Sequence, residues 1–221
     1  MAVASPAMAG CCDPSGYRRV FSSEQAAKAV RAFERKGLDG TAGPMIAALE
    51  ARSISGSTLL EVGAGPATAL VTLLEAGVAR AVAYDISPSY EKVAGALLQG
   101  RGLQDRVEWR TGDYLASDDQ RDADVVFLNR VVCCYPEMSP LVDAVAGHTR
   151  GLLALSYPRR RWFTRAAIGV MNGYLALRRV PFRVFVHDPR SIAERVSAAG
   201  LHPVASGGTR TWEWRVWERA A

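Results

Sequence analysis

Acidic residues and glycines next to apolar runs are the residues of this chain best suited to chemistry. Residues 59–67 are Leu-Leu-Glu-Val-Gly-Ala-Gly-Pro-Ala, so an apolar run that carries Glu61 passes into a glycine-rich turn. Glycine has no Cβ, which lets the backbone approach a ligand closely. Asp85 and Asp113 follow two later apolar runs. In open α/β sheets, the crevice where strands turn into helices binds nucleotides.

The turn does not complete the dinucleotide-binding fingerprint. That fingerprint, G-x-G-x-x-G, requires a third glycine at position 68, where this chain has Thr68. Glu61, two residues before the first glycine, suits a cationic or amino-bearing ligand. We therefore expect such a ligand here and not a pyrophosphate.

Alternating apolar runs and helical patterns must position these residues. Strands are predicted over 58–62, 79–84, 106–110, 124–128 and 151–156. Helices are predicted over 22–36, 42–51, 67–76, 87–98 and 139–148. This alternation indicates parallel βαβ units in an open α/β sheet.

The chain after the fifth strand departs from this rhythm. It predicts a helix over 161–179, a strand-like run over 182–186, a helix over 188–199 and final strands over 201–205 and 211–217. Polar and apolar residues alternate in the last strand, which is typical of an antiparallel strand with one packed face.

Over roughly residues 58–156 the sequence resembles the class I S-adenosylmethionine (SAM) methyltransferases. The turn Glu61-Val62-Gly63-Ala64-Gly65 is similar to their first motif, with Ala67 at the place of the usual third glycine. The resemblance implies a methyltransferase with SAM as cofactor. It also implies an α/β fold with a Rossmann-like, mostly parallel seven-stranded sheet, an antiparallel C-terminal strand, N-terminal helices and a helical insert after the fifth strand.

The resemblance also implies which residues hold the donor. Asp85 corresponds to the acidic residue that binds both ribose hydroxyls, and Asp113 to the one that binds the adenine amino group. Tyr114 or Ile86 would flank the adenine ring, and Asn129 would lie beside the methionine part. The predicted cofactor-binding residues are Glu61, Gly63, Ala64, Gly65, Asp85, Ile86, Asp113, Tyr114 and Asn129.

Two side chains are candidate catalytic residues, although methyl transfer from a sulfonium needs alignment more than a base. His187 has the intrinsic pKa of a general base. Tyr135 lies in residues 131–136, which look like the stretch after the fourth strand of magnesium-protoporphyrin O-methyltransferases, with Cys134 in place of a His. No metal ligands are predicted, although a metal or a bridge between the pairs Cys11-Cys12 and Cys133-Cys134 stays an alternative.

The composition of the 221 residues is that of an ordinary globular chain, with 49% hydrophobic and 22% charged residues and a net charge of +5. We expect a flexible tail over 1–16 and one domain over 17–221, with N-terminal helices over 17–57 and a lid-like insert over 158–183. Since no run of about 18 uncharged apolar residues occurs, a transmembrane helix is not expected. The expected location is cytoplasmic.

Positive charge is concentrated around the insert. From Ala144 to His187 there is no Asp or Glu, but there are eight Arg. The apolar helix over 161–179 is expected to cover the acceptor pocket, with a packing helix or a membrane-surface helix as alternatives. Arg159, Arg160 or Arg161 is expected to position an acidic acceptor or a membrane lipid.

The sequence thus predicts O- or N-methylation of a small, apolar, anionic molecule. A nucleic-acid methyltransferase is an alternative suggested by the Arg residues, but residues 129–132 lack the Asn/Asp-Pro-Pro-Tyr/Phe motif common in base-modifying enzymes. A non-catalytic or redox-sensing SAM-binding protein is a second alternative, suggested by the paired cysteines. The oligomeric state is not predicted.

Overall fold

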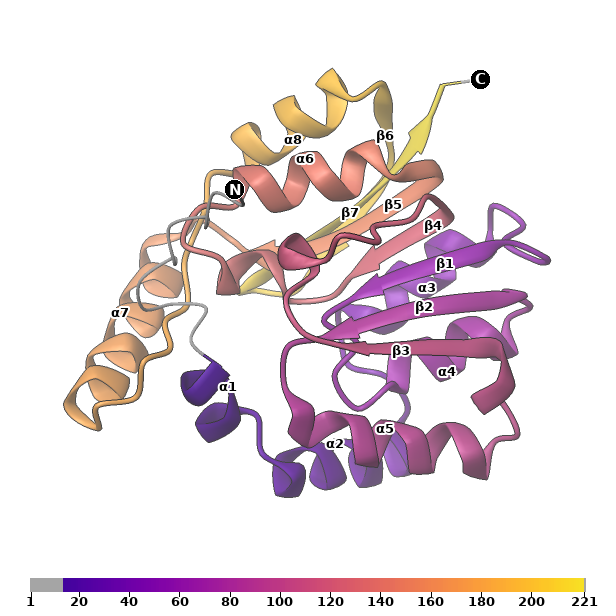
Figure 1. Ribbon diagram of the computed structural model, residues 1–221. Coiled ribbons are helices and arrows are strands. Elements are labelled where there is room, and N and C mark those ends of the chain that lie inside the picture. Colours follow the sequence, from indigo (N-terminus) through magenta and orange to yellow (C-terminus); the bar gives the residue numbers. More distant parts are fainter. Residues whose placement is uncertain (1–13, 221) are drawn as a thin grey trace, which may run out of the picture.

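Seven strands form one mixed sheet in the computed structural model, which describes residues 14–220 (Figure 1). The strands are β1 (Thr58–Val62), β2 (Arg80–Asp85), β3 (Val107–Thr111), β4 (Ala123–Leu128), β5 (Thr149–Pro158), β6 (Leu201–Gly208) and β7 (Trp212–Arg219). Their order across the sheet is β3-β2-β1-β4-β5-β7-β6. The first five are parallel, and β7 pairs antiparallel with β5 and β6. The predicted fold class is therefore confirmed.

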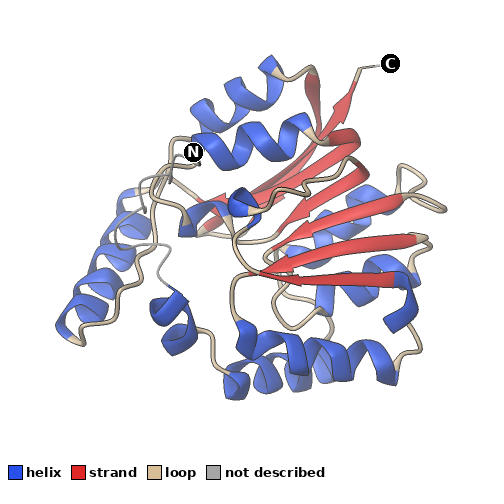
Figure 2. Cartoon of the chain, in the orientation of Figure 1, coloured by secondary structure: helices blue, strands red, loops and turns tan. Residues whose placement is uncertain are grey.

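Helices cover both faces of this sheet, as Figure 2 shows. They are α1 (Pro14–Val20), α2 (Ser23–Lys36), α3 (Ala42–Glu50), α4 (Thr68–Glu75), α5 (Pro88–Gly100), α6 (Ser139–Gly147), α7 (Trp162–Leu177) and α8 (Pro189–Ala198). Three short 3₁₀ turns are η1 (Gln104–Arg106), η2 (Tyr114–Ala116) and η3 (Val132–Cys134). Local signals set several helix starts: the Ser22 hydroxyl accepts a hydrogen bond from the Gln25 N–H, and the Asp188 carboxylate accepts one from the Arg190 N–H.

Alternate residues of each strand enter two separate apolar cores. In β4, Val125 and Phe127 pack on the face covered by α3, α4 and α5, whereas Val126 and Leu128 pack on the face covered by α6 and α8. Parallel strands buried on both faces have this pattern. Since the first five strands run the same way, their carboxyl ends meet at one edge of the sheet.

The last strand does not have the single packed face that its alternation predicted. Trp214 and Val216 pack in the first core, but Trp217 is fully buried in the second core on the opposite face. β7 lies between β5 and β6, so α6 and α8 cover the face that the alternation had assigned to solvent.

The insert leaves the sheet after β5. α7 projects beside the sheet and the chain returns along it (Figure 1). Residues 182–186, predicted to be strand-like, are irregular. The Asn172 side chain donates to the Val184 carbonyl at 2.7 Å and accepts from its N–H at 2.9 Å, while the Phe185 N–H donates to the Cys133 carbonyl at 2.7 Å. These bonds take the place of a strand ladder.

The N-terminal helix α1 contacts this insert. It begins at Pro14, within the predicted tail 1–16. A Cβ on Gly16 would lie 2.2 Å from the Pro181 carbonyl oxygen, so glycine allows this close approach. The Cys11-Cys12 pair lies outside the described residues.

No helix within residues 14–220 has both the length and the apolar composition that crossing a bilayer requires.

Replacing Trp217 by Ala should cost about 3–5 kcal/mol of unfolding free energy, because it empties a large volume in the second core. Urea unfolding followed by circular dichroism measures the change. Trp162 is the matched control: it is 81% exposed, so Trp162→Ala should change the free energy by less than about 0.5 kcal/mol. Equal losses in the two variants would contradict the assignment of Trp217 to the core.

Candidate active site

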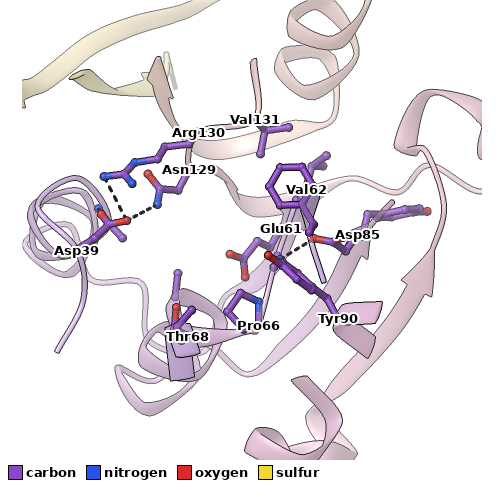
Figure 3. A pocket seen from close by; sticks show the side chains of 18 of the residues that line it. Asp39, Glu61, Val62, Pro66, Thr68, Asp85, Tyr90, Asn129, Arg130 and Val131 are labelled. Carbon is purple, nitrogen blue, oxygen red and sulfur yellow. Dashed lines mark hydrogen bonds and ion pairs between the residues drawn. The ribbon is translucent and has the colours of Figure 1, made fainter. Parts of the chain in front are cut away.

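A cavity of about 600 Å³ opens at the carboxyl edge of the sheet. Figure 3 shows Asp39, Asn129 and Arg130 on one side of it and Asp85 and Tyr90 on the other, with Glu61 between them. Its walls come from α1, α2, the α2–α3 loop and the ends of β1, β2 and β4. The predicted residues that line it are Glu61, Gly63, Ala64, Gly65, Asp85, Ile86, Tyr114, Asn129 and Tyr135.

The glycine-rich turn after β1 forms the floor of the cavity in an unusual backbone conformation. Gly63, Gly65 and Ala67 have φ angles of 72°, 56° and 64°. A Cβ on Gly63 would also lie 2.4 Å from the Val131 side chain. Left-handed φ angles cost an L-residue roughly 1–2 kcal/mol, which explains the glycines and makes Ala67 the strained position.

The amides of this turn bond within the protein. The N–H groups of Gly63 and Ala64 both donate to the Tyr84 carbonyl, at 2.8 and 3.0 Å, and the Gly65 N–H donates to Asp85. A phosphate-binding loop instead points its amides at the ligand. The turn therefore favours a ligand without a pyrophosphate, as the sequence predicted.

Asp85 is a buried carboxylate at the end of β2. Its Oδ2 accepts from the Gly65 N–H at 2.7 Å and its Oδ1 from the Ser87 N–H at 2.8 Å. Burial raises its pKa to about 6, although both backbone hydrogen bonds lower it. Each carboxylate oxygen keeps a lone pair for a further donor such as a hydroxyl.

Glu61 is buried in the middle of the site. Its Oε2 has no hydrogen-bond partner among the described residues. Burial, followed by the charge of Asp85, raises the pKa of Glu61 well above its ordinary value. A buried carboxyl without a partner is costly, so its place at the cavity suits a ligand that brings a donor or a positive charge.

The predicted adenine-binding residues separate into two groups. Ile86 and Tyr114 line the cavity, and the Tyr114 ring meets the Tyr84 ring edge-on at 5.1 Å. Asp113 does not line it. Its Oδ1 instead accepts from the Leu115 N–H at 3.1 Å and from the Tyr135 hydroxyl at 2.6 Å.

The two candidate catalytic residues are linked to each other, but only Tyr135 lines the cavity. His187 Nε2 lies 2.9 Å from the Tyr135 carbonyl oxygen, and since a carbonyl only accepts, this nitrogen carries a proton. Burial lowers the pKa of His187, although hydrogen bonds to carbonyls oppose the shift. His187 therefore contacts the backbone of Tyr135 and is not among the residues that line the cavity.

A polar network next to Asn129 was not predicted from the sequence. Asn129 Oδ1 accepts from the Ser156 hydroxyl at 2.7 Å and lies 2.9 Å from the Thr41 hydroxyl oxygen, whose one proton is shared with Asp39. Asp39 Oδ1 accepts from the Thr41 hydroxyl and from the N–H groups of Thr41 and Ala42, at 2.7–2.8 Å. The only sequence signal was Asp39-Gly40-Thr41, a helix-capping pattern before α3.

Arg130 closes this network on the side of β7. Its Nη2 lies 3.4 Å from Asp39 Oδ2, and its guanidinium lies 4.9 Å from the Trp212 ring centre. Burial alone would raise the pKa of Asp39, but its hydrogen bonds and the charge of Arg130 hold it below the ordinary value. Arg130 has a φ of 62°, a left-handed conformation directly after β4.

The outer wall of the cavity is aromatic and comes from the N-terminal helices. Tyr17, Phe21 and Phe33 line it, with Lys36 at the end of α2. No residue of the insert 158–183 is among the described lining residues, whereas residues of α1 and α2 do line the cavity.

Glu61→Gln should raise the stability of the ligand-free protein at pH 8. Because the pKa of Glu61 is higher in the folded than in the unfolded protein, the folded state binds more protons between these two values, and stability falls as pH rises through that window. Glutamine carries no charge, so we expect a Tm gain of about 2–4 °C at pH 8, the shift that 1 kcal/mol produces in a chain of this size. The gain should shrink toward pH 4.

Differential scanning fluorimetry across this pH range measures the effect. Glu50→Gln is the matched control, because Glu50 is exposed at the end of α3. A destabilised Glu61→Gln variant at pH 8 would mean that the Glu61 carboxylate has a stabilising partner.

Comparison with known proteins agrees with this geometry. A family model described as a methyltransferase domain matches residues 35–206. Ribosomal protein L11 methyltransferases from Yersinia pseudotuberculosis and Escherichia coli are 33% and 30% identical over 110 residues, which cover 49% of this chain. The chain spans about a third of the length of these relatives, with 36% of each covered.

Solved structures share the fold across most of the chain. The magnesium protoporphyrin IX methyltransferase of Synechocystis, with bound S-adenosylhomocysteine, has a TM-score of 0.69 and 19% identity, with 93% of both chains covered. An O-methyltransferase family 2 protein of Planctomyces limnophilus, in complex with apigenin, has a TM-score of 0.65 and 19% identity, with 93% of this chain and 65% of that chain covered. Because the family model covers most of the chain and the sheet has the predicted seven strands with an antiparallel C-terminal strand, the chain belongs to the methyltransferase-domain family, whose enzymes use SAM as the methyl donor.

Proposed function

We propose that this protein transfers the methyl group of SAM to a small molecule with a flat, apolar body and an acidic group. One observation carries the proposal. A single cavity is lined both by predicted donor-binding residues and by an aromatic wall of Tyr17, Phe21 and Phe33, and Lys36 also lines it. The predicted donor-binding residues suit SAM, and the aromatic wall suits an aromatic acceptor.

The residues at the carboxyl edge fit SAM. Asp85 keeps lone pairs for the two ribose hydroxyls, and Ile86 and Tyr114 offer apolar surface for the adenine. The unpartnered Glu61 carboxyl suits the cationic methionine part, beside Asn129. When bound, SAM supplies a methyl group activated by its sulfonium.

Alignment of the acceptor is then the main task of the protein. A carboxylate acceptor is ionised at neutral pH and needs no base. In this proposal Tyr135 and His187 are positioning residues: His187 holds the Tyr135 carbonyl, and the Tyr135 hydroxyl holds Asp113.

Lys36 is the residue proposed to meet the acidic group. No carboxylate of the described residues lies within 4 Å of its ammonium, whereas Arg130 is already paired with Asp39. Lys36 takes the place of Arg159, Arg160 and Arg161 as the proposed partner of an acidic acceptor, because none of these three lines the cavity. Arg160 pairs with Asp188, and the Arg159 guanidinium donates to the Trp212 carbonyl at 3.1 Å.

Two structural neighbours support a flat acceptor. One is named for the methylation of magnesium protoporphyrin IX and the other is in complex with apigenin, and both of these compounds are flat ring systems. An aromatic wall can stack on such rings.

Asp85→Ala should weaken SAM binding by about 30-fold to nearly 1,000-fold, since charge-assisted bonds to two hydroxyls contribute roughly 2–4 kcal/mol. Wild-type affinity should also fall as pH drops through about 6, where Asp85 takes up a proton. Isothermal titration calorimetry with SAM measures both effects. Asp105→Ala, an exposed residue in η1, is the control and should bind normally. Unchanged affinity in Asp85→Ala would show that the ribose contact is misassigned.

Lys36→Gln should raise the KM for an aromatic acid about tenfold or more, since one charge-assisted bond contributes about 1.5–3 kcal/mol. SAM affinity should stay within about twofold, because Lys36 is not among the residues assigned to the donor and makes no ion pair with them among the described residues. Transfer of radiolabelled methyl from SAM to a panel of aromatic acids and their amides measures this. The amides should show no change in KM.

Lys28→Gln is the matched control, since Lys28 is exposed on the same helix and does not line the cavity. Labelling of ribosomal protein or of RNA, with no labelling of small molecules, would contradict the proposed acceptor class.

A further inference from the structure

One face of α7 is apolar and exposed. Trp162, Ala166, Val170, Tyr174 and Leu177 recur at helical spacing and form a single stripe, called here the α7 stripe. Four of these side chains are 81%, 76%, 58% and 81% exposed. The stripe runs the length of the helix, about 22 Å at 1.5 Å per residue. Exposed apolar stripes of this size indicate an interaction surface.

The opposite face of α7 already holds the helix on the protein. Thr164 is buried, and Ile168 and Leu175 are half-buried. Asn172 on this face bonds both backbone groups of Val184. Packing of α7 therefore uses one face and leaves the α7 stripe without a structural role in the described chain.

Positive charge surrounds the stripe at both ends. Five exposed Arg side chains have no ion-pair partner among residues 14–220: Arg161, Arg165, Arg178, Arg179 and Arg183. Asp188, the first acidic residue after this segment, is paired with Arg160. Aromatic and aliphatic side chains between arginines are typical of helices that lie in the membrane interface.

We propose that α7 docks the protein on an anionic lipid surface, with the α7 stripe in the headgroup region and the five Arg on lipid phosphates. Charge favours this occupant over a second copy of the chain, because two copies facing each other through α7 would bring ten unpaired Arg together. The helix lies on the membrane and does not cross it, since α7 has only 16 residues.

The insert is also connected to the wall of the cavity. Phe182, at its C-terminal end, meets the rings of Tyr17 and Phe21 edge-on at 5.3 and 5.4 Å. Both of these residues line the cavity. Docking through α7 would therefore hold the aromatic wall close to the lipid. The inference itself does not depend on which acceptor is methylated.

Vesicle co-sedimentation tests the proposal. Full-length protein should bind vesicles of equal parts phosphatidylcholine and phosphatidylglycerol, and high salt should release it. Its affinity for vesicles of phosphatidylcholine alone should be lower by about tenfold or more. Trp162 is exposed in solution, so its fluorescence should shift to the blue on binding. A variant in which Trp162, Val170 and Leu177 are all changed to Ser should bind the anionic vesicles at least about tenfold more weakly.

A charge-matched pair of variants separates the patch from net charge. The variant with Arg165, Arg178 and Arg179 all changed to Gln should lose about tenfold or more in binding. The control with Arg31, Arg80 and Arg210 all changed to Gln loses the same charge from exposed sites elsewhere and should lose much less. SAM titration of each variant verifies that it is folded.

Equal losses in the two charge variants, or no binding to anionic vesicles, would overturn the proposal. So would concentration-dependent dimers that disappear in the Ser variant, because a second copy would then cover the α7 stripe.

Discussion

The burial of two carboxyl groups at the ends of neighbouring strands is the constraint on which this site depends. Glu61 and Asp85 are both buried, which raises the pKa of each, and the charge of Asp85 makes Glu61 still harder to ionise. The protein offsets this cost at Asp85 with two backbone N–H donors, one of them from Gly65. It leaves Glu61 Oε2 without a hydrogen-bond partner among residues 14–220. A ligand that brings hydroxyl donors and a positive charge would offset the cost of burying both groups, which supports the proposed role of the two carboxyl groups in SAM binding.

The backbone around these groups is held by long-range contacts. Gly63 needs its left-handed conformation and its missing Cβ because Val131, which follows β4, packs against it. Ser87 begins α5, but its hydroxyl donates to the Phe21 carbonyl and so ties the donor end of the cavity to the N-terminal helices. A hydrogen bond therefore connects the start of α5, next to Asp85, with Phe21 of the aromatic wall.

The insert gives the same protein a second kind of surface. Its inner face contacts the chain through Asn172 and through Phe182, while its outer face presents the α7 stripe and unpaired arginines. A soluble core does not require such a helix, because the two apolar cores on the sheet are complete without it. The co-occurrence of positive charge and an exposed apolar stripe on one helix is the pattern on which the proposed membrane docking rests.

The sequence by itself determined the sheet, the donor turn and the acidic strand ends. Hydrophobic periodicity and glycine placement are local properties, so β1 was predicted to the residue and Asp85 was assigned to the end of its strand. The environment of each side chain was decided only by the tertiary structure. Trp217 is buried because β7 inserts between β5 and β6, and His187 lies behind Tyr135 because the irregular segment after the insert folds over the edge of the sheet. The Asp39–Asn129 network joins residues 90 positions apart. Such contacts form between segments far apart in the sequence, so no local sequence pattern predicts them.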